Sequence, residues 1–242
     1  MKSTATTIIE QGVKIPETEE ILYIKPIFPL RKTKYYESLK SKGDIVEVDG
    51  FETTKFMFEN GYFKYYKSQI SEGLEKVKES KKGTQQSARR TYTPVKQSRD
   101  DNEARTCVVA STANIYRAFG KNTTEEELLN KLNDTFTENG TLPIGAFTAQ
   151  LEQAGFSKKY ISDKSPTELV EAIQQGFVVQ AVWEDHTRVI SGMFNNEDGE
   201  TYLIVNDPLP NQPEAYAVSL QELYAVPLSW DNLTLTGYKL DE

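Results

Sequence analysis

In the second half of the chain the spacing of apolar residues changes once, from a helical to a strand-like period, and this limits the fold more than any other feature. Helical spacing relates Val108, Thr112, Ile115, Tyr116 and Phe119. Glycine ends this run at Gly120, and further helical patterns continue up to Gly176. The runs FVVQAVW, HTRVISGMF and TYLIVND then have the composition of strands, and the Asp198-Gly199 pair indicates a hairpin. Helices followed by antiparallel strands predict an α+β fold.

Capping signals support the individual helices. Thr123 and Thr124, followed by glutamates, form two overlapping capping boxes before an apolar run. A third helix is predicted over residues 144–154, and Ser165-Pro166-Thr167-Glu168 combines a cap, a proline at the first helical position and a glutamate at the third. Near the end, Ser219 caps a short helix and NLTLTGYKL predicts a closing strand.

The first hundred residues divide into three regions. Residues 1–20 are a polar lead-in, and residues 21–66 are predicted to form a small α/β accessory module. Within this module the runs ILYIKPIF and GDIVEV predict strands, FETTKFMFENG predicts a short helix, and Tyr62–Tyr66 predicts a further strand. Residues 67–106 form a polar and basic region, and residues 107–242 form the main domain.

The region 67–106 is interpreted as a solvated linker. Its first part, SQISEGLEKVKESKKG, is compatible with a short polar helix, whereas TQQSARRTYTPVKQSRDDNEAR has neither a helical nor a strand-like period. Only 38% of the chain is hydrophobic, which is low for a fully packed globule and predicts one exposed stretch. The alternatives are contact of this basic run with an acidic partner or with nucleic acid, and an inhibitory propeptide.

Composition excludes several classes of function. The net charge is −8 and the isoelectric point is about 5.0, which argues against nucleic acid as the main partner. One cysteine cannot form an internal disulfide, which fits a reducing compartment. No secretory signal and no apolar run of membrane-spanning length is visible. We expect a cytoplasmic or particle-associated protein without a membrane partner.

The one cysteine and the one histidine both lie where a thiol nucleophile and its base are needed. Cys107 opens the predicted helix that follows Thr106, and backbone N–H groups at a helix start stabilise a thiolate. His186 lies at the start of a predicted strand, where it can take the thiol proton and return it to a leaving amine. Asp207 ends the next strand, where a carboxylate can orient the imidazole.

Each of these residues also has a plain structural interpretation. Cys107 can be a buried core residue, His186 a hydrogen-bonded residue at a strand edge, and Asp207 a turn residue before Pro208. Asn206 competes with Asp207 as the orienting group, because an amide can fill this role. Neighbouring strand residues point to opposite faces, so only one of the two is expected to face His186.

Residues 102–225 resemble the papain-like cysteine peptidases, and within them the C39-like branch that includes bacteriocin-processing domains and bacterial effector proteases. The matching pieces are CVVASTANIYRAFGKNTTEEELL, VEAIQQGFVVQAVWEDHTRVISGMF and YLIVNDPL. The resemblance implies that Cys107 is the nucleophile, His186 the base and Asp207 the orienting residue. It implies a peptide or protein substrate and neither a metal nor a cofactor, since one cysteine and one histidine make a poor zinc site.

Two positions depart from the family pattern. The family usually places a glutamine five or six residues before the cysteine, where its amide helps to form the oxyanion hole, but this chain has Asp101 and Asn102 there. We therefore expect Asn102 to supply the oxyanion contact and Gln97, ten residues before the cysteine, to lie too far away. The residue after the cysteine is often glycine or tryptophan in the family and is Val108 here.

A shorter likeness concerns the accessory module. Residues Pro26 to Lys64 are similar to small modules of phage structural proteins, in which a GDxVEV strand precedes a short helix and a glycine-aromatic turn. This likeness implies phage virion proteins as further partners. It leaves two alternatives to a peptidase: a virion structural or cargo protein that keeps a papain-like scaffold, and a deamidase or transglutaminase-like acyl transferase with the same three residues.

Overall fold

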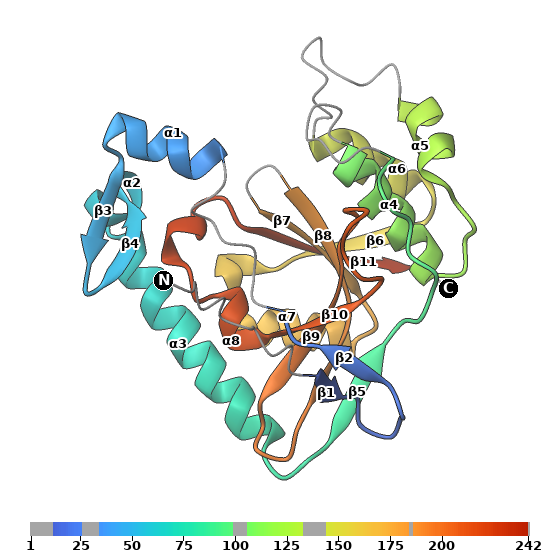
Figure 1. The fold of residues 1–242 in the computed structure, drawn as a ribbon, viewed down its shortest axis with the longest axis horizontal. Helices are drawn as coiled ribbons and strands as arrows, with labels where there is room; N and C mark the ends of the chain where they lie inside the picture. The colour runs from blue at the N-terminus through green and yellow to red at the C-terminus, as the bar shows by residue number, and fades with distance from the viewer. Residues whose placement is uncertain (1–11, 26–33, 99–105, 133–143, 184–185, 242) are drawn as a thin grey trace, which may run out of the picture.

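The centre of the computed structural model is one antiparallel sheet in the order β10–β9–β8–β7–β11–β6 (Figure 1). The structure describes residues 12–25, 34–98, 106–132, 144–183 and 186–241. The strands of this path are β6 (Phe156–Tyr160), β7 (Val178–Trp183), β8 (His186–Asn195), β9 (Thr201–Asn206), β10 (Tyr216–Ser219) and β11 (Thr234–Leu240). The helix patterns precede most of these strands, and the predicted α+β class is confirmed.

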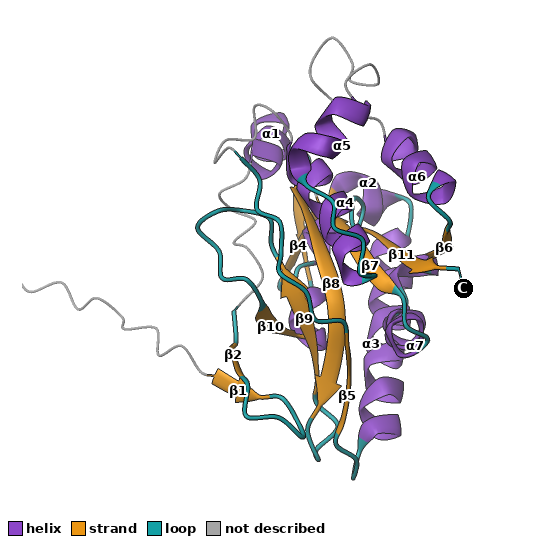
Figure 2. Ribbon diagram, turned by 90° about the vertical axis from the view of Figure 1, so that its right-hand side faces the viewer, coloured by secondary structure: helices purple, strands orange, loops and turns teal. Residues whose placement is uncertain are grey.

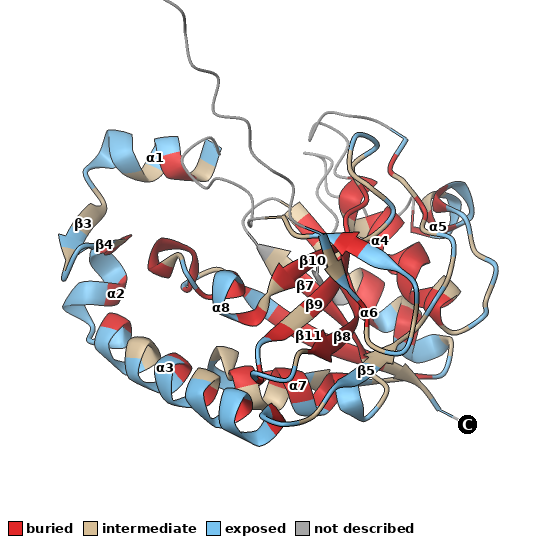
Figure 3. Cartoon of the chain, turned by 60° about the horizontal axis from the view of Figure 1, so that its bottom comes forward, coloured by how far each residue is buried: buried red, intermediate tan, exposed pale blue. Residues whose placement is uncertain are grey.

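One face of the sheet is covered by α4 (Thr106–Ala118), α5 (Glu125–Leu132) and α6 (Ile144–Gln153). The capping box before α5 forms as predicted, because the backbone N–H groups of Thr124 and Glu127 donate to each other's side chains at 3.0 and 3.1 Å. Figure 3 shows that α4 is buried along nearly its whole length, between the sheet and its neighbours. The helix that carries the cysteine is therefore a core element.

The other face is covered by α3 (Tyr62–Lys81), α7 (Pro166–Gln174) and the short α8 (Leu220–Leu223). Ser165 caps α7 and Ser219 caps α8, each by accepting a backbone N–H three residues later, as predicted. The strand predicted at Tyr62–Tyr66 is wrong, since these residues begin α3. Phe63, Ile70 and Val77 recur every seven residues and are buried, so the helical period wins over the local aromatic content.

The segment interpreted as a solvated linker is packed into the domain. Residues Gln86–Arg89 form β5, which pairs with the far half of β8 (Figure 2). The extended residues that follow are tied to α4, because Asn114 accepts from the Val95 N–H at 2.6 Å and donates to its carbonyl at 3.0 Å. We call residues 90–98 the strap. Its lack of period reflects pairing through the backbone and single side chains, which leaves no repeating apolar pattern.

The accessory module contains α1 (Lys34–Lys42), the hairpin β3 (Ile45–Val48) and β4 (Phe51–Thr54), and α2 (Lys55–Glu59). It contacts the C-terminal part of the chain, where Tyr36 packs on Leu228, and nearby the ring of Phe63, at the start of α3, stacks on Trp230 with centroids 6.0 Å apart. A separate hairpin of β1 (Gly12–Lys14) and β2 (Ile21–Tyr23) packs on β8, β9 and β10. The division of the chain into the predicted domains stays a prediction.

Candidate active site

Cys107 lies in the first turn of α4, as the sequence predicted, and is 3% exposed. The helix is held against the start of β8 by Ser111, whose hydroxyl donates to the Thr187 carbonyl oxygen at 3.0 Å. Thr187 also contacts the Cys107 sulfur through its backbone and side chain. Because Thr187 follows His186 directly, α4 and β8 bring the cysteine and the histidine into one neighbourhood.

The environment of Cys107 favours the neutral thiol. Burial raises the pKa of the Cys107 thiol, and this effect exceeds the lowering by hydrogen bonds from Thr187 and from the Val108 backbone. The helix start alone favoured a lowered pKa, but this position is buried deeply enough for desolvation to outweigh it. A group that removes the thiol proton is therefore needed for Cys107 to act as a nucleophile.

His186 begins β8 and pairs through its backbone with Trp183 of β7. Its Nε2 atom lies 2.8 Å from Oδ1 of Asp207, and its side chain is 14% exposed. An ionised carboxylate only accepts hydrogen bonds, so Nε2 carries the proton and Nδ1 is the basic nitrogen of the neutral ring. This tautomer suits a base that takes a proton from a thiol.

Asp207 faces the histidine, whereas Asn206 turns away. Asn206 accepts from the Tyr92 hydroxyl at 3.1 Å and donates to the Glu214 carbonyl at 2.6 Å. Asp207 is 2% exposed, and its pKa lies well below the usual value. Burial opposes ionisation of Asp207, but the hydrogen bond with His186 and other nearby positive charge outweigh it.

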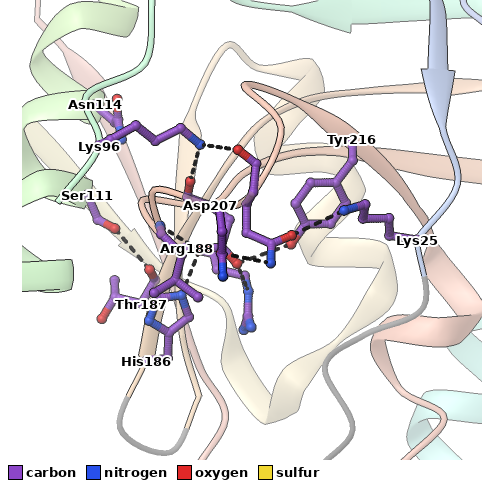
Figure 4. A network of polar contacts seen from close by, with 12 residues as sticks. Lys25, Lys96, Ser111, Asn114, His186, Thr187, Arg188, Asp207 and Tyr216 are labelled. Carbon is purple, nitrogen blue, oxygen red and sulfur yellow. Dashed lines mark hydrogen bonds and ion pairs between the residues drawn. The ribbon is translucent and has the colours of Figure 1, made fainter. Parts of the chain in front are cut away.

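Further side chains hold Asp207 in place (Figure 4). Arg188 donates to Oδ2 at 2.8 Å, and Tyr216 approaches the same oxygen at 3.4 Å. Lys96 of the strap donates to the carbonyl oxygens of Asp207, Gln212 and Pro213 at 2.8, 3.1 and 3.0 Å. Sequence reasoning missed these residues. Arg188 alone had a signal, since it lies two positions after His186 and strand period places both on one face.

The predicted oxyanion residue, Asn102, lies outside the described residues. Gln97 is 3% exposed, and its backbone N–H donates to the Pro208 carbonyl at 2.8 Å, next to Asp207. Glu125 at the start of α5 makes polar contacts with both Ser98 and Thr106, while burial raises the pKa of its carboxyl group. Ser98 and Thr106 adjoin Gln97 and Cys107, so the ten-residue separation does not place Gln97 far from the cysteine in space.

The described residues give two further findings. They contain no cluster of three or more His, Cys, Asp or Glu side chains that would hold a metal ion. No helix among them combines the length and the apolar character that crossing a bilayer requires.

Several chains of solved structures are similar to this chain. One is a double glycine motif protease from an AMS/PCAT transporter, in complex with the leader peptide, at 18% identity and a TM-score of 0.44 over 63% of this chain and 95% of that chain. Another is UfSP from C. elegans, at 16% identity and a TM-score of 0.44 over 66% of this chain and 35% of that chain. No curated protein matches the chain.

The family comparison covers the strap, α4 and the sheet. The model described as the Peptidase_C39 like family matches residues 89–237, which is more than half of the chain. The match begins at Arg89, within β5, and includes Cys107, His186 and Asp207. The likeness of residues 26–64 to phage modules lies outside it and stays a prediction. The chain belongs to the peptidase C39-like family.

Proposed function

We propose that this chain hydrolyses a peptide or isopeptide bond, with Cys107 as nucleophile, His186 as base and Asp207 as the residue that orients His186. The observation that carries the proposal is the 2.8 Å contact between His186 Nε2 and Asp207 Oδ1, at a strand start that packs on the helix turn of Cys107. Family membership supports a peptide or protein as the substrate.

The reaction follows from the protonation states. His186 Nδ1 takes the thiol proton as the Cys107 sulfur attacks the amide carbonyl carbon and forms the carbon–sulfur bond. The imidazolium then gives this proton to the leaving nitrogen, and the carbon–nitrogen bond breaks. Water, deprotonated by the neutral imidazole, releases the acyl group and restores the thiol. Asp207 stays ionised throughout and stabilises the transient imidazolium.

The oxyanion of the tetrahedral intermediate needs hydrogen-bond donors, and two amides are candidates. Asn102 occupies the place that the resemblance assigns to a glutamine, and Gln97 is a buried amide on the strap beside Pro208. We expect Gln97→Ala to lower kcat by roughly 10²–10³, because the loss of one oxyanion donor costs this much. Asn102→Ala is expected to lower kcat by less than about tenfold, because Gln97 then still supplies the donor. Steady-state kinetics of both variants checks this, and the reverse ranking would return the role to Asn102.

A peptide vinyl sulfone tests the proposed nucleophile and base together. Since Cys107 is the single cysteine, intact-mass spectrometry reports its labelling without a digest. We expect one adduct per chain at neutral pH, and a labelling rate at least about a hundredfold lower in His186→Ala, because the thiol then lacks its base. Equal labelling rates in the two proteins would contradict the proposed pair.

The matched control is Asn206→Ala, which changes the neighbour of Asp207 that faces away from the histidine. Its labelling rate is expected to stay close to that of the wild type. Iodoacetamide in denaturant should label all three proteins equally, which excludes loss of the thiol by oxidation. The mass of the reaction product then separates hydrolysis from deamidation: a cut peptide supports the peptidase, and a gain of about one mass unit on glutamine contradicts it.

A further inference from the structure

The carboxylate of Asp207 is shared between two side chains of β8. Its Oδ1 lies 2.8 Å from His186 Nε2, and its Oδ2 accepts from Arg188 Nε at 2.8 Å. The side chains of Arg188 and Asp207 are 12% and 2% exposed, so the ion pair is largely shielded from water. To orient His186, Asp207 needs only its contact with the Nε2 atom of that ring. The second contact brings the full positive charge of Arg188 beside the proposed base.

The position of Arg188 on β8 places its side chain beside both His186 and Asp207. His186 and Arg188 are two residues apart on one strand, so both reach the end of the neighbouring strand β9 from the same face. The Leu209 N–H donates to Oδ1 at 3.1 Å, and the Tyr216 hydroxyl approaches Oδ2 at 3.4 Å. Each carboxylate oxygen therefore has defined donors, and among these donors Arg188 carries a permanent positive charge.

We propose that Arg188 is a positioning residue, which holds Asp207 with Oδ1 toward His186 and, by its charge, favours the neutral imidazole in the resting protein. The inference rests on the proposed function, because it assigns His186 the part of a base that must begin unprotonated. A carboxylate without a second partner would stabilise the imidazolium more strongly. The positive charge of Arg188 offsets part of this stabilisation of the imidazolium, while the hydrogen bond between His186 and Asp207 stays in place.

The other charged and titratable groups around Asp207 do not replace this effect. Lys96 on the strap directs its ammonium group to backbone carbonyls, and burial lowers its pKa. Lys25 lies over the Tyr216 ring at 5.8 Å, and burial raises the pKa of Tyr216 to about 12, so that residue stays neutral. Among the described residues, Glu214 near Lys96 and Cys107 on α4 are two further titratable groups in this neighbourhood.

The single histidine makes the test direct, because an NMR titration of the imidazole resonances reports His186 alone. In Arg188→Gln we expect the pKa of His186 to rise by about one unit, since a positive charge beside the same carboxylate is removed. Arg188→Lys keeps the charge and should leave the His186 pKa close to the wild-type value. An unchanged His186 pKa in a folded Arg188→Gln variant would overturn the proposal.

Two controls separate this effect from damage to the fold. Arg90→Gln removes a guanidinium that bonds to the Gly176 carbonyl and stacks on Phe119, and it should leave the His186 pKa unchanged. If Arg188→Gln does not fold, Asp207→Asn measures the same charge. With the carboxylate gone, Arg188 should lower the His186 pKa by about one unit below the ordinary histidine value of about 6.5. A value at or above 6.5 would contradict the proposal.

The titration and the function fail in different ways. The NMR titration needs no substrate, so the effect of Arg188 on the His186 pKa remains measurable even if the protein cleaves no peptide. In that case the proposed function is wrong and the electrostatic role stands. Conversely, Cys107 of the wild type could be labelled and peptides cleaved as expected while the His186 pKa stays unchanged in Arg188→Gln. The proposed function would then stand, and the proposed role of Arg188 would be wrong.

Discussion

Replacing Cys107 with serine should lower kcat/KM for any cleaved peptide by at least about 10⁵-fold, because the residues of a nucleophile–base set act as a unit. A serine hydroxyl is far less acidic than a thiol, and His186 alone would have to remove its proton. Burial already raises the pKa of the Cys107 thiol, so the site has little capacity to ionise a weaker acid. Hydrolysis of a fluorogenic peptide measures the loss.

The control for this prediction lies one turn further along the same helix. Ser111→Ala removes the hydrogen bond from α4 to the Thr187 carbonyl, without touching the thiol. We expect it to cost roughly 1–3 kcal/mol of unfolding free energy, since a buried carbonyl loses its partner, and less than tenfold in rate. If Cys107→Ser keeps more than about one per cent of the activity, Cys107 is not the nucleophile.

The helices could be predicted largely because their ends carry local chemistry. The box of Thr124 with Glu127, and the caps at Ser165 and Ser219, depend on backbone groups only a few residues away. The position of Cys107 at the start of α4 follows from the same local pattern. Such signals stay readable in a single sequence because no distant partner is needed to form them.

The strap could not be predicted, because its interactions are distant. Its Val95 backbone is held by Asn114 on α4, and Lys96 is held by carbonyl groups more than a hundred residues away. Neither contact requires a periodic sequence. The same reasoning applies to Gln97: distance along the chain is a poor measure of distance in space when Ser98 and Thr106 contact one carboxyl group of α5.

Within the candidate site, strand period limited which neighbouring residues could face His186, and tertiary structure decided between them and supplied their partners. The alternation rule allowed only one of Asn206 and Asp207 to meet His186, and the structure places Asp207 there. The rule could not say which, because the face depends on the register of β9 with β8. Tyr216 reaches the same carboxylate from β10, a strand that the sequence did not predict.

Asp207→Asn should lower kcat by roughly 10⁴, the loss seen when a serine protease's orienting aspartate becomes an amide. The reason here is specific: Arg188 and the protonated Nε2 of His186 both donate to the carboxylate, at opposite oxygens. An asparagine has only one acceptor oxygen, so its NH₂ group must face either the arginine or the proton that defines the basic tautomer. Peptide hydrolysis at pH 7, with Asn206→Ala as the matched control at less than a tenfold loss, measures this.

Adding Arg188→Gln to the Asp207→Asn variant sharpens the test. A glutamine at position 188 offers an oxygen that accepts from the asparagine NH₂, which frees the asparagine oxygen for His186. We expect the double variant to regain about tenfold in kcat over Asp207→Asn, a coupling that independent effects would not produce. Additive losses in this double-mutant cycle would contradict the shared-carboxylate arrangement.

The single substitution Asp207→Asn also changes how the stability of the fold depends on pH. The folded-state pKa of Asp207 lies below the unfolded value of about 3.9, so its ionisation stabilises the fold above that pH and this contribution disappears as pH falls through the folded-state pKa. The wild type should therefore lose stability on acidification below about pH 4, and Asp207→Asn should show a smaller acid slope in urea unfolding. Asp207→Ala leaves Arg188 buried without its carboxylate and should cost about 3–5 kcal/mol at pH 7. Equal acid slopes in the wild type and Asp207→Asn would mean that Asp207 is not held in its ionised form by His186 and Arg188.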